Sequence, residues 1–284
     1  MRAEISGRGA PLPCYIARVP QLVAAGRRLE YEWIEGAQPD HPALVFLHEG
    51  LGSIRQWRDF PRRVTERTGA SALVYDRYGY GQSEVLAEAR VPVHFMHDEA
   101  LHCLPEVLAA RGLHAPILIG HSDGASIALI HAGAGHPVQA LVVLAPHVFV
   151  EDVCVQSIEH ARLAFETTDL AVRLARYHRD PRRTFYLWND VWLDPEFRRW
   201  NIESSLGGIR CPVLAIQGED DEYGTMAQIE AIARQVRGPC EVVKLARCGH
   251  APHRDRPEET LEAIARFVAR FGRPRVPEAQ ALAR

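Results

Sequence analysis

Short aliphatic runs that alternate with helical patterns are the feature that most constrains the fold of this chain. The runs are nearly continuous in apolar residues, as expected of strands that are buried on both faces of a sheet. They occupy residues 43–47, 72–75, 116–119, 140–144, 213–216 and 241–245. Helical patterns lie between them at residues 55–67, 97–111, 125–134, 226–236 and 258–270. This alternation predicts an α/β fold with a mostly parallel central sheet and helices on both faces.

Two segments depart from the alternation. Residues 22–35 read as a β-hairpin that turns at Gly26. Residues 149–208 contain no strand-like run and are rich in aromatic side chains on short helical patterns, which predicts a helical cap inserted into the fold. The expected organisation is therefore a first core part (1–148), the cap (149–208), a second core part (209–272) and a flexible tail (273–284).

The charge balance points away from nucleic acid and membrane surfaces. The 284 residues are 47% hydrophobic, enough for one sizeable core, and the net charge is only -3 with the basic residues scattered along the chain. No window approaches the ~20 apolar residues of a membrane span, and residues 1–20 lack the pattern of a signal peptide. The six cysteines form no CxxC pair, which favours reduced thiols in the cytoplasm. A homo-oligomer is compatible with the sequence.

A serine between two glycines stands at the end of one predicted strand. The stretch Gly120-His121-Ser122-Asp123-Gly124 fits the pattern G-x-S-x-G. It follows the strand pattern and precedes a helical pattern, which is the strand–turn–helix setting of a nucleophile elbow. In such a turn the serine takes strained backbone angles, and glycines on either side let the strand and the helix approach. The sequence thus predicts a reactive Ser122 rather than an inert polar turn.

A serine hydroxyl needs a base to become a nucleophile, and the base needs an acid to orient it. With a nucleophile elbow the chain order is Ser, then Asp or Glu, then His. Residues 217–223 (QGEDDEY) follow one predicted strand and offer the acid, while residues 247–253 (RCGHAPH) follow the next and offer the base. Both segments fall at carboxyl ends of strands, where open α/β sheets place their sites.

These motifs resemble those of the α/β-hydrolase superfamily over about residues 20–272. The matching stretches are LHEGLGS (47–53), DRYGYGQS (76–83), GHSDG (120–124), GEDD (218–221) and CGHAPH (248–253). The resemblance implies a capped serine hydrolase with a Ser-Asp-His triad. Its usual spacing selects Asp221 as the acid, with Asp220 as the alternative, and His250 as the base. We expect His253 in the loop or as a cap of the following helix.

An oxyanion hole requires two backbone N–H groups that point at the developing alkoxide. One is expected from Asp123, the residue after the nucleophile. The resemblance takes the other from the loop after residues 43–47, where Gly50 is the donor by position. The family usually has glycine where this chain has Glu49. We expect the Glu49 side chain to form a hydrogen bond that fixes the loop, with contact to the substrate as the alternative.

The side chain of Asp123 has two interpretations. The first is a cap on the helix that begins beside it, where an acidic residue is favourable. The second is a contact with a cationic amino group of the substrate, since some hydrolases with the S-D-G elbow act on amino-acid esters. We favour the helix cap.

The predicted substrate pocket combines residues from three places. Trp188 and Trp192 are four apart and share one face of a helix in the predicted cap. His147 and Phe149 follow the strand 140–144 and enter the cleft beside the nucleophile. Trp57 follows the oxyanion loop, and Glu49 belongs to that loop. The aromatic residues of the cap are expected both to line the acyl pocket and to pack the cap itself.

No cofactor and no metal are expected. His94, His97 and Asp98 have a spacing that metal ligands use, but serine triad chemistry needs no metal, so we interpret them as ordinary surface or interface residues. The stretch DRYGYGQS is interpreted as structural, with Asp76 or Arg77 in an internal ion pair.

The sequence as a whole predicts a serine hydrolase that cleaves a small ester, thioester or lactone through an acyl-enzyme, with a small-molecule acyl compound as its substrate. A serine at the elbow argues against the haloalkane dehalogenases and epoxide hydrolases of this fold, which use aspartate there. Reactions that share the triad stay open: C–C bond hydrolysis of ring-cleavage products, amino-acid ester or peptide hydrolysis, and lyase chemistry. A further alternative is a ligand-sensing protein with slow turnover.

Overall fold

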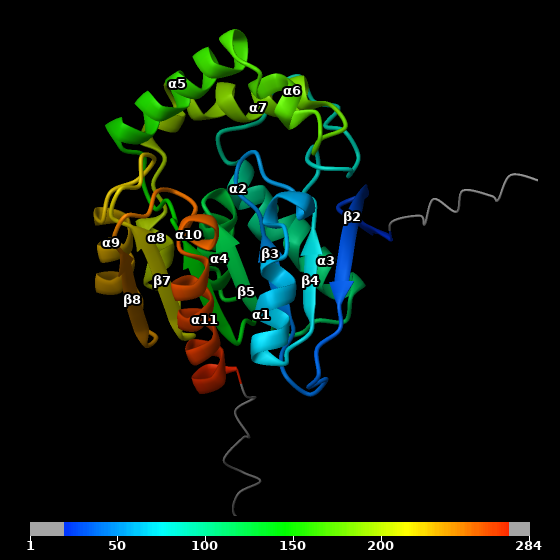
Figure 1. Ribbon diagram of the computed structural model, residues 1–284, viewed down its shortest axis with the longest axis vertical. Helices are drawn as coiled ribbons and strands as arrows, with labels where there is room; N and C mark the ends of the chain where they lie inside the picture. The colour runs from blue at the N-terminus through cyan, green and yellow to red at the C-terminus, as the bar shows by residue number, and fades with distance from the viewer. Residues whose placement is uncertain (1–19, 273–284) are drawn as a thin grey trace, which may run out of the picture.

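An eight-stranded sheet runs through the centre of the computed structural model, which describes residues 20–272 (Figure 1). The strand order is β1-β2-β4-β3-β5-β6-β7-β8. The pairs β1–β2 and β2–β4 are antiparallel, and every other neighbouring pair is parallel. The strands are β1 (Gln21–Ala24), β2 (Arg27–Ile34), β3 (Leu44–Leu47), β4 (Ala72–Tyr75), β5 (Ile117–His121), β6 (Ala140–Leu144), β7 (Val213–Gly218) and β8 (Cys240–Leu245).

The predicted mostly parallel sheet is therefore confirmed. The predicted hairpin is also present, because β1 and β2 pair antiparallel around Gly26, whose φ of 71° suits the turn. The remaining strands lie where the aliphatic runs predicted them. The expected tail (273–284), the stretch without a signal-peptide pattern up to residue 19, and Cys14 lie outside the described residues.

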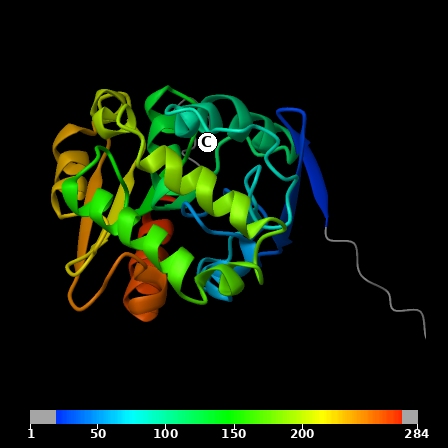
Figure 2. The same ribbon diagram turned by 90° about the horizontal axis from the view of Figure 1, so that it is seen from above.

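Helices cover both faces of the sheet (Figures 1 and 2). They are α1 (Phe60–Thr68), α2 (Phe95–Asp98), α3 (Leu104–Ala110), α4 (Asp123–Gly133), α5 (Asp152–Thr167), α6 (Leu170–Leu174), α7 (Pro181–Trp192), α8 (Glu203–Leu206), α9 (Ala227–Gln235), α10 (Pro252–Asp255) and α11 (Pro257–Phe271). Short 3-10 turns occur at η1 (Ile54–Trp57) and η3 (Phe197–Arg199). One π-helical turn, η2 (Glu99–Cys103), joins α2 to α3.

Two predicted helices are irregular: one is broken and one contains a π-helical turn, and a proline lies close to each irregularity. The pattern at 55–67 splits at Arg58, whose φ is 56°, and resumes as α1 with Pro61 in its first turn. Proline is tolerated in that turn because its missing N–H has no helical partner there. The pattern at 97–111 stays helical but widens into the π turn η2 just before Pro105, which cannot donate a hydrogen bond to the preceding turn.

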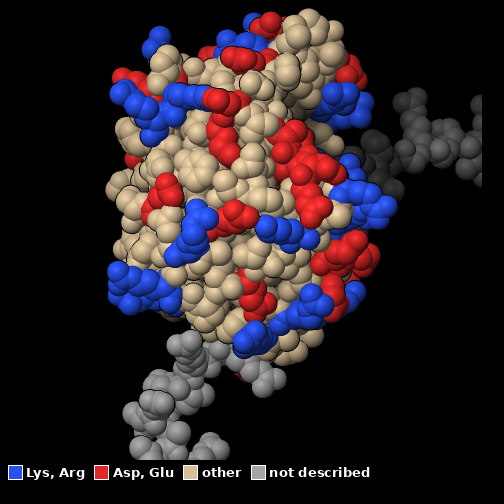
Figure 3. Space-filling model, turned by 90° about the vertical axis from the view of Figure 1, so that its left-hand side faces the viewer, with Lys and Arg blue, Asp and Glu red and all other residues tan. Residues whose placement is uncertain are grey.

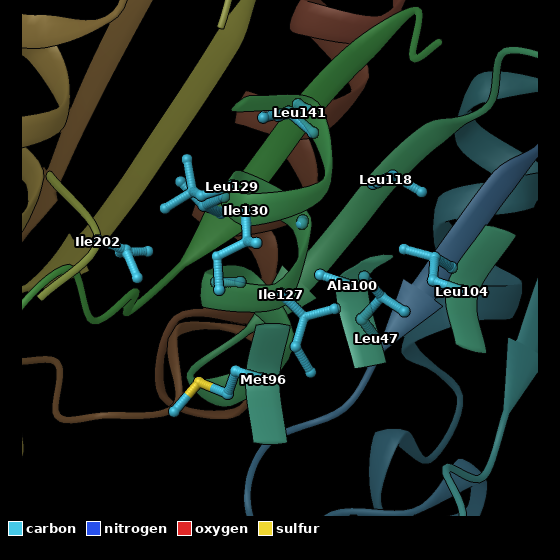
Figure 4. Close-up of a cluster of buried hydrophobic side chains, with 14 of the residues drawn as sticks. Leu47, Met96, Ala100, Leu104, Leu118, Ile127, Leu129, Ile130, Leu141 and Ile202 are labelled. Carbon is cyan, nitrogen blue, oxygen red and sulfur yellow. The ribbon is translucent and has the colours of Figure 1, made fainter. Parts of the chain in front are cut away.

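The core forms two layers, one on each face of the sheet. Along β5, Leu118 points into the layer under α3 and α4, whereas Ile117 and Ile119 point into the layer under α1 and α11. Figure 4 shows the first layer, with Leu47, Leu118 and Ile127 among its labelled side chains. Successive residues of a strand point to opposite faces, so a strand covered on both faces is apolar throughout.

Helices α5 to α8 lie between β6 and β7 in the chain, and α5, α6 and α7 arch across the upper ends of the strands (Figures 1 and 2). Their aromatic side chains pack together: the rings of Phe165 and Phe185 stack at 3.9 Å, and Trp192 meets Phe197 at 4.8 Å. No strand of the sheet falls within 149–208. The boundaries of the cap and of the two core parts stay our proposal.

Within residues 20–272, no helix has the length and apolar composition that crossing a membrane requires. The cysteines of this range are all unpaired thiols. On the face shown in Figure 3, basic and acidic side chains are interspersed.

Trp57 lies in the core and not in a pocket. Its side chain is 2% exposed and belongs to the layer under α1 and α11. It meets the ring of Phe46 at 5.4 Å and that of His253 at 4.8 Å. Its indole N–H has no hydrogen-bond partner among the described residues.

This position predicts a stability effect without a substrate effect. Trp57→Ala should lower the free energy of unfolding by about 3–5 kcal/mol, because it leaves a large cavity. Trp57→Phe should cost much less, since no hydrogen bond of the indole is lost. Urea unfolding measures both, with the exposed Val23→Ala as the control. If Trp57→Ala left the stability unchanged but altered KM, Trp57 would be a pocket residue and not a core residue.

Candidate active site

Ser122 occupies a strained turn between β5 and α4. Its φ of 52° and ψ of -119° are rare for a residue other than glycine. A Cβ atom at Gly120 would lie 2.4 Å from the carbonyl oxygen of Gly124, and one at Gly124 would lie 2.0 Å from the carbonyl oxygen of Leu47. Gly120 thus lets β5 lie close to the start of α4, and Gly124 lets α4 lie close to the end of β3. The turn thereby presents the Ser122 side chain at the carboxyl end of the sheet.

The structure brings Ser122, His250 and Asp221 together in one hydrogen-bonded chain. His250 Nε2 lies 2.9 Å from Ser122 Oγ. His250 Nδ1 lies 2.9 Å and 3.0 Å from the two carboxylate oxygens of Asp221. Since a carboxylate only accepts, Nδ1 carries the proton and Nε2 accepts from the serine hydroxyl. Asp220, the alternative acid, is exposed and makes no contact of this kind.

The Asp221 carboxylate is fixed by its own neighbours. Its Oδ1 accepts hydrogen bonds from the backbone N–H groups of Tyr223 at 2.8 Å and Gly224 at 3.3 Å. Its Oδ2 accepts one from Gln217 Nε2 at 2.6 Å. The side chain is fully buried, so these donors replace water around the charge. The acid can therefore hold the His250 ring in one orientation.

The contact between His250 and Asp221 raises the pKa of His250 and lowers that of Asp221, which suits His250 as a general base. Burial alone would lower the pKa of His250, but the hydrogen bond and the charge of Asp221 outweigh it and raise that pKa above 6.5. Burial alone would raise the pKa of Asp221, but the hydrogen bond and the charge of His250 outweigh it and lower that pKa. The carboxylate stays ionised at neutral pH and stabilises a positive charge on the imidazole.

A cavity of about 330 Å³ opens onto Ser122. Among its walls are four of the predicted pocket residues, Glu49, His147, Trp188 and Trp192, and the two expected oxyanion-hole residues, Gly50 and Asp123. Trp57 and Phe149 do not line it: Trp57 is in the core, and Phe149 packs half-buried at the base of the inserted helices, where its carbonyl accepts from Gln228 at 3.1 Å. Trp57 follows a loop in the sequence and Phe149 follows a strand. These positions do not determine on which side of the sheet a ring lies.

The cavity also contains residues that the sequence did not single out. Cys154 and Ile158 come from α5, one turn apart, Glu222 and Tyr223 come from the loop that carries the acid, and Arg254 comes from α10, just after the base. The helical spacing of Cys154 and Ile158 shows that they share a face. No local sequence pattern predicts that this face of α5 covers Ser122.

The Glu49 side chain contacts the neighbouring loops as close charge pairs, and not through the expected hydrogen bond. Its carboxylate lies 3.3 Å from His121 Nδ1 and 3.5 Å from the guanidinium of Arg254. Burial would raise the pKa of Glu49, but His121 and then Arg254 outweigh it and keep that pKa well below its usual value. His121 in turn donates from Nε2 to the carbonyl of His250 at 2.7 Å. The oxyanion loop, the serine turn and the base loop are thereby connected.

Both expected N–H donors border the cavity. Asp123 is the first residue of α4, so its N–H has no acceptor within the helix. The N–H of Gly50 makes no hydrogen bond within residues 20–272. A Cβ atom at Gly50 would lie 2.0 Å from Nε1 of Trp188, so the indole rests directly on this backbone and excludes any larger residue. We keep the oxyanion role of the two amides as a proposal.

The helix-cap interpretation of Asp123 is wrong. Its side chain is 1% exposed, yet neither carboxylate oxygen accepts a hydrogen bond from any described residue. The capping position belongs to the residue before the first helical one, and that residue is Ser122. Burial raises the pKa of the Asp123 carboxyl to about 6, although Arg77, His250 and the indole of Trp192 act in the opposite direction. A buried carboxylate without a hydrogen-bond partner is costly, so the position of Asp123 requires an explanation other than a helix cap.

His147 is buried beside the triad, with its ring 5.5 Å from that of His250 and 5.1 Å from that of Trp192. Burial, and then the nearby His250, lower the pKa of His147 to about 3, so it is neutral at physiological pH. Its Nδ1 has no partner among the described residues. A neutral imidazole there can exchange a hydrogen bond with substrate.

Two further expectations change. His253 is neither in the loop nor a cap of α11: it is 4% exposed within α10, and its ring lies 4.9 Å from that of His121.

Neither Asp76 nor Arg77 forms an ion pair with a described residue. Asp76 accepts the backbone N–H groups of Ile54 at 2.6 Å and Gln82 at 2.8 Å instead.

No metal-binding cluster of three or more His, Cys, Asp or Glu side chains exists in the described part of the chain. Of the three residues with metal-like spacing, His94 and Asp98 contact each other at 3.2 Å on the surface.

Comparison with known proteins agrees with this architecture. A family model described as "Alpha/beta hydrolase family" matches residues 44–263. The chain belongs to the alpha/beta hydrolase family. The enol-lactonase from Burkholderia xenovorans LB400 shares the fold at a TM-score of 0.69 and 17% identity, over 88% of this chain and 100% of that one.

Among characterised relatives, the chain is 24% identical over 265 residues to a 2-succinyl-6-hydroxy-2,4-cyclohexadiene-1-carboxylate synthase from Salmonella paratyphi B. That match covers 81% of this chain and 95% of the relative. A proline iminopeptidase from Lactobacillus helveticus is 30% identical over 118 residues, or 40% of this chain and 38% of that one. The relatives thus support an enzyme of the hydrolase fold and differ in the reactions that their names describe.

The raised pKa of His250 predicts the pH dependence of turnover. The base must be neutral to accept the serine proton, so activity should fall as the pH drops through a pKa that lies above 6.5. Asp221→Asn removes the main cause of the raised pKa, so the acid limb should move to lower pH while kcat falls by about 10³–10⁴-fold. A pH profile of kcat/KM measures both. Asp220→Asn is the control, and an acid limb that moves in the control instead would make Asp220 the acid.

Proposed function

We propose that this protein is a serine hydrolase that cleaves a small ester, thioester or lactone through an acyl-enzyme. The observation that carries the proposal is the chain of hydrogen bonds from Ser122 Oγ through His250 to Asp221, at 2.9 Å for each link, at the floor of a cavity. The reduced cysteines fit a cytoplasmic location, which we keep as part of the proposal.

Acylation begins with the serine hydroxyl. His250 Nε2 removes the proton as Ser122 Oγ attacks the acyl carbonyl, and the resulting imidazolium is stabilised by the Asp221 carboxylate. The oxyanion of the tetrahedral intermediate is bound by the N–H groups of Asp123 and Gly50. The imidazolium then protonates the leaving group, which departs and leaves an ester on Ser122.

Deacylation repeats these steps with water. His250 takes a proton from a water molecule, which attacks the acyl-enzyme and forms a second tetrahedral oxyanion in the same hole. Collapse of this intermediate releases the acid and returns the proton to Ser122. The cavity of about 330 Å³ suits a small acyl group.

A panel of short p-nitrophenyl esters, thioesters, lactones and vinylogous diketones tests the proposal. At least one acyl compound should be turned over, and Ser122→Ala should reduce kcat by about 10³-fold or more. Cleavage of the diketones alone would favour C–C bond hydrolysis. Tight binding of a panel member with negligible turnover by the wild type would instead favour a ligand sensor and contradict the enzyme proposal.

A second candidate, hydrolysis of amino-acid esters or amides, is favoured by one observation. The cavity is lined by four carboxylates (Glu49, Asp123, Glu222 and Asp255) and one guanidinium (Arg254). Glu49 is paired with His121, and Glu222 and Asp255 accept backbone N–H groups at 3.2 Å and 2.8 Å. Only Asp123 has no partner, so its charge is available to a substrate ammonium group. The same acidic lining opposes substrates with several carboxylates.

Removing the charge of Asp123 tests this candidate. Asp123→Asn keeps the shape and the backbone N–H of the residue, so kcat/KM for esters with a free α-amino group should fall by about 10²-fold, while neutral esters of equal size change by less than about threefold. Asp220→Asn removes a nearby charge outside the cavity and serves as the control. Equal losses on both ester classes would exclude recognition of a cation by Asp123.

A further inference from the structure

Arg77 is a buried cation without an anionic partner. Its side chain is 2% exposed, and no carboxylate of residues 20–272 comes within ion-pairing distance of it. The ring of Tyr80 lies 4.5 Å from the guanidinium carbon, and the charges of Asp123 and Glu99 also act on it. Burying a charge costs free energy unless hydrogen bonds or an opposite charge offset it, so the hydrogen bonds of this guanidinium are what must be examined.

Those hydrogen bonds go to the oxyanion loop. Arg77 Nη2 donates to the carbonyl of Glu49 at 3.0 Å and to that of His48 at 3.4 Å. The imidazole of His48 adds a second donor to the same Glu49 carbonyl, from Nδ1 at 2.7 Å. Two donors, one of them charged, therefore hold one carbonyl oxygen.

The tautomer of His48 is fixed by Arg77 as well. The backbone N–H of Arg77 donates to His48 Nε2 at 3.1 Å, so that nitrogen carries no proton. Burial, and then the charge of Arg77, keep the pKa of His48 well below 6.5, so the ring is neutral and its single proton sits on Nδ1. The donor toward Glu49 is thus present at every pH at which the enzyme would work.

The carbonyl of Glu49 belongs to the same peptide unit as the N–H of Gly50. In a planar trans peptide these two groups point in opposite directions, and the described residues contain no cis peptide. Holding the carbonyl toward the buried guanidinium turns the N–H the other way, to the side on which Gly50 borders the cavity. Glycine after the peptide bond removes the steric barrier to a flip, so the orientation depends on the donors that hold the carbonyl.

We propose that Arg77, acting with His48, is a positioning residue that orients the Glu49–Gly50 peptide so that its N–H forms one half of the oxyanion hole. The inference rests on the proposed acyl-transfer function of Ser122. The guanidinium charge also polarises the peptide, which strengthens the Gly50 N–H as a donor when the carbonyl oxygen of the substrate becomes negative.

The test compares Arg77→Gln and Arg77→Lys with the wild type on the best ester of the panel. Arg77→Gln should lower kcat by about 10–100-fold with KM within about twofold, because the interaction strengthens only in the transition state. Arg77→Lys should fall between, since it keeps the charge but not the planar fork. The control is Arg111→Gln, since Arg111 also stacks on an aromatic ring, 4.8 Å from Tyr31, but is only half-buried. It should change thermal stability and leave kcat as it is.

Ligand binding separates positioning from a merely structural role. A trifluoromethyl ketone forms a tetrahedral oxyanion on Ser122, so Arg77→Gln should weaken its binding by the same factor as kcat/KM. The product acid, which carries no tetrahedral centre, should bind unchanged. A folded Arg77→Gln protein that binds the ketone as tightly as the wild type overturns the inference, as does an equal loss for both ligands. A wild type without Ser122-dependent turnover contradicts the proposed function instead.

A measurement on the wild type keeps the inference testable if the variants do not fold. In a crystal structure with the trifluoromethyl ketone bound, the hemiketal oxygen should lie about 2.7–3.1 Å from the Gly50 nitrogen. The Glu49 carbonyl should still accept from Arg77 and His48. A flipped peptide, or a hemiketal oxygen held by other donors, overturns the inference.

Discussion

Ser122 sits at a φ of 52°, in a turn packed so tightly that a methyl group at Gly120 would overlap the backbone of α4, and one at Gly124 would overlap the backbone at the end of β3. The surrounding structure maintains this strain, because Ser122 N–H is bonded to the carbonyl of Leu144 on β6 and the turn is buried in the centre of the sheet. The position of the serine is therefore set by the parallel sheet itself. The acid and the base reach it from the ends of β7 and β8, and the oxyanion loop from the end of β3.

Burial makes the electrostatics of the site unusually selective. Each carboxylate around the cavity except Asp123 has a partner inside the protein, and the buried guanidinium of Arg77 is directed at carbonyl groups and not at an acid. In a medium of low polarity such groups act strongly over short distances. The site therefore combines a cavity lined mainly by acidic side chains with a buried cation whose hydrogen bonds go to the loop after β3. We propose that the first selects the substrate and that the second favours negative charge at the oxyanion.

The sheet, the elbow and the order of the triad could be predicted because each is written in a local pattern: buried strands in aliphatic runs, the turn in its glycines, and His250 in its place after a strand. The expectation for Trp57 failed because the position after a loop does not determine a face of the sheet. The cap role of Asp123 failed because α4 begins one residue earlier than a capping geometry requires. The partners of Arg77 are backbone carbonyls, which every residue has, so no side-chain pattern could reveal them.

The bond from His121 Nε2 to the carbonyl of His250 has a dynamic consequence. His121 precedes the serine in the chain, and the carbonyl belongs to the base itself, so one hydrogen bond joins the two segments within a residue of their reacting atoms. Thermal displacement of the base loop then carries the serine turn with it. This hydrogen bond therefore limits changes in the distance between the serine oxygen and the His250 nitrogen that lies 2.9 Å from it.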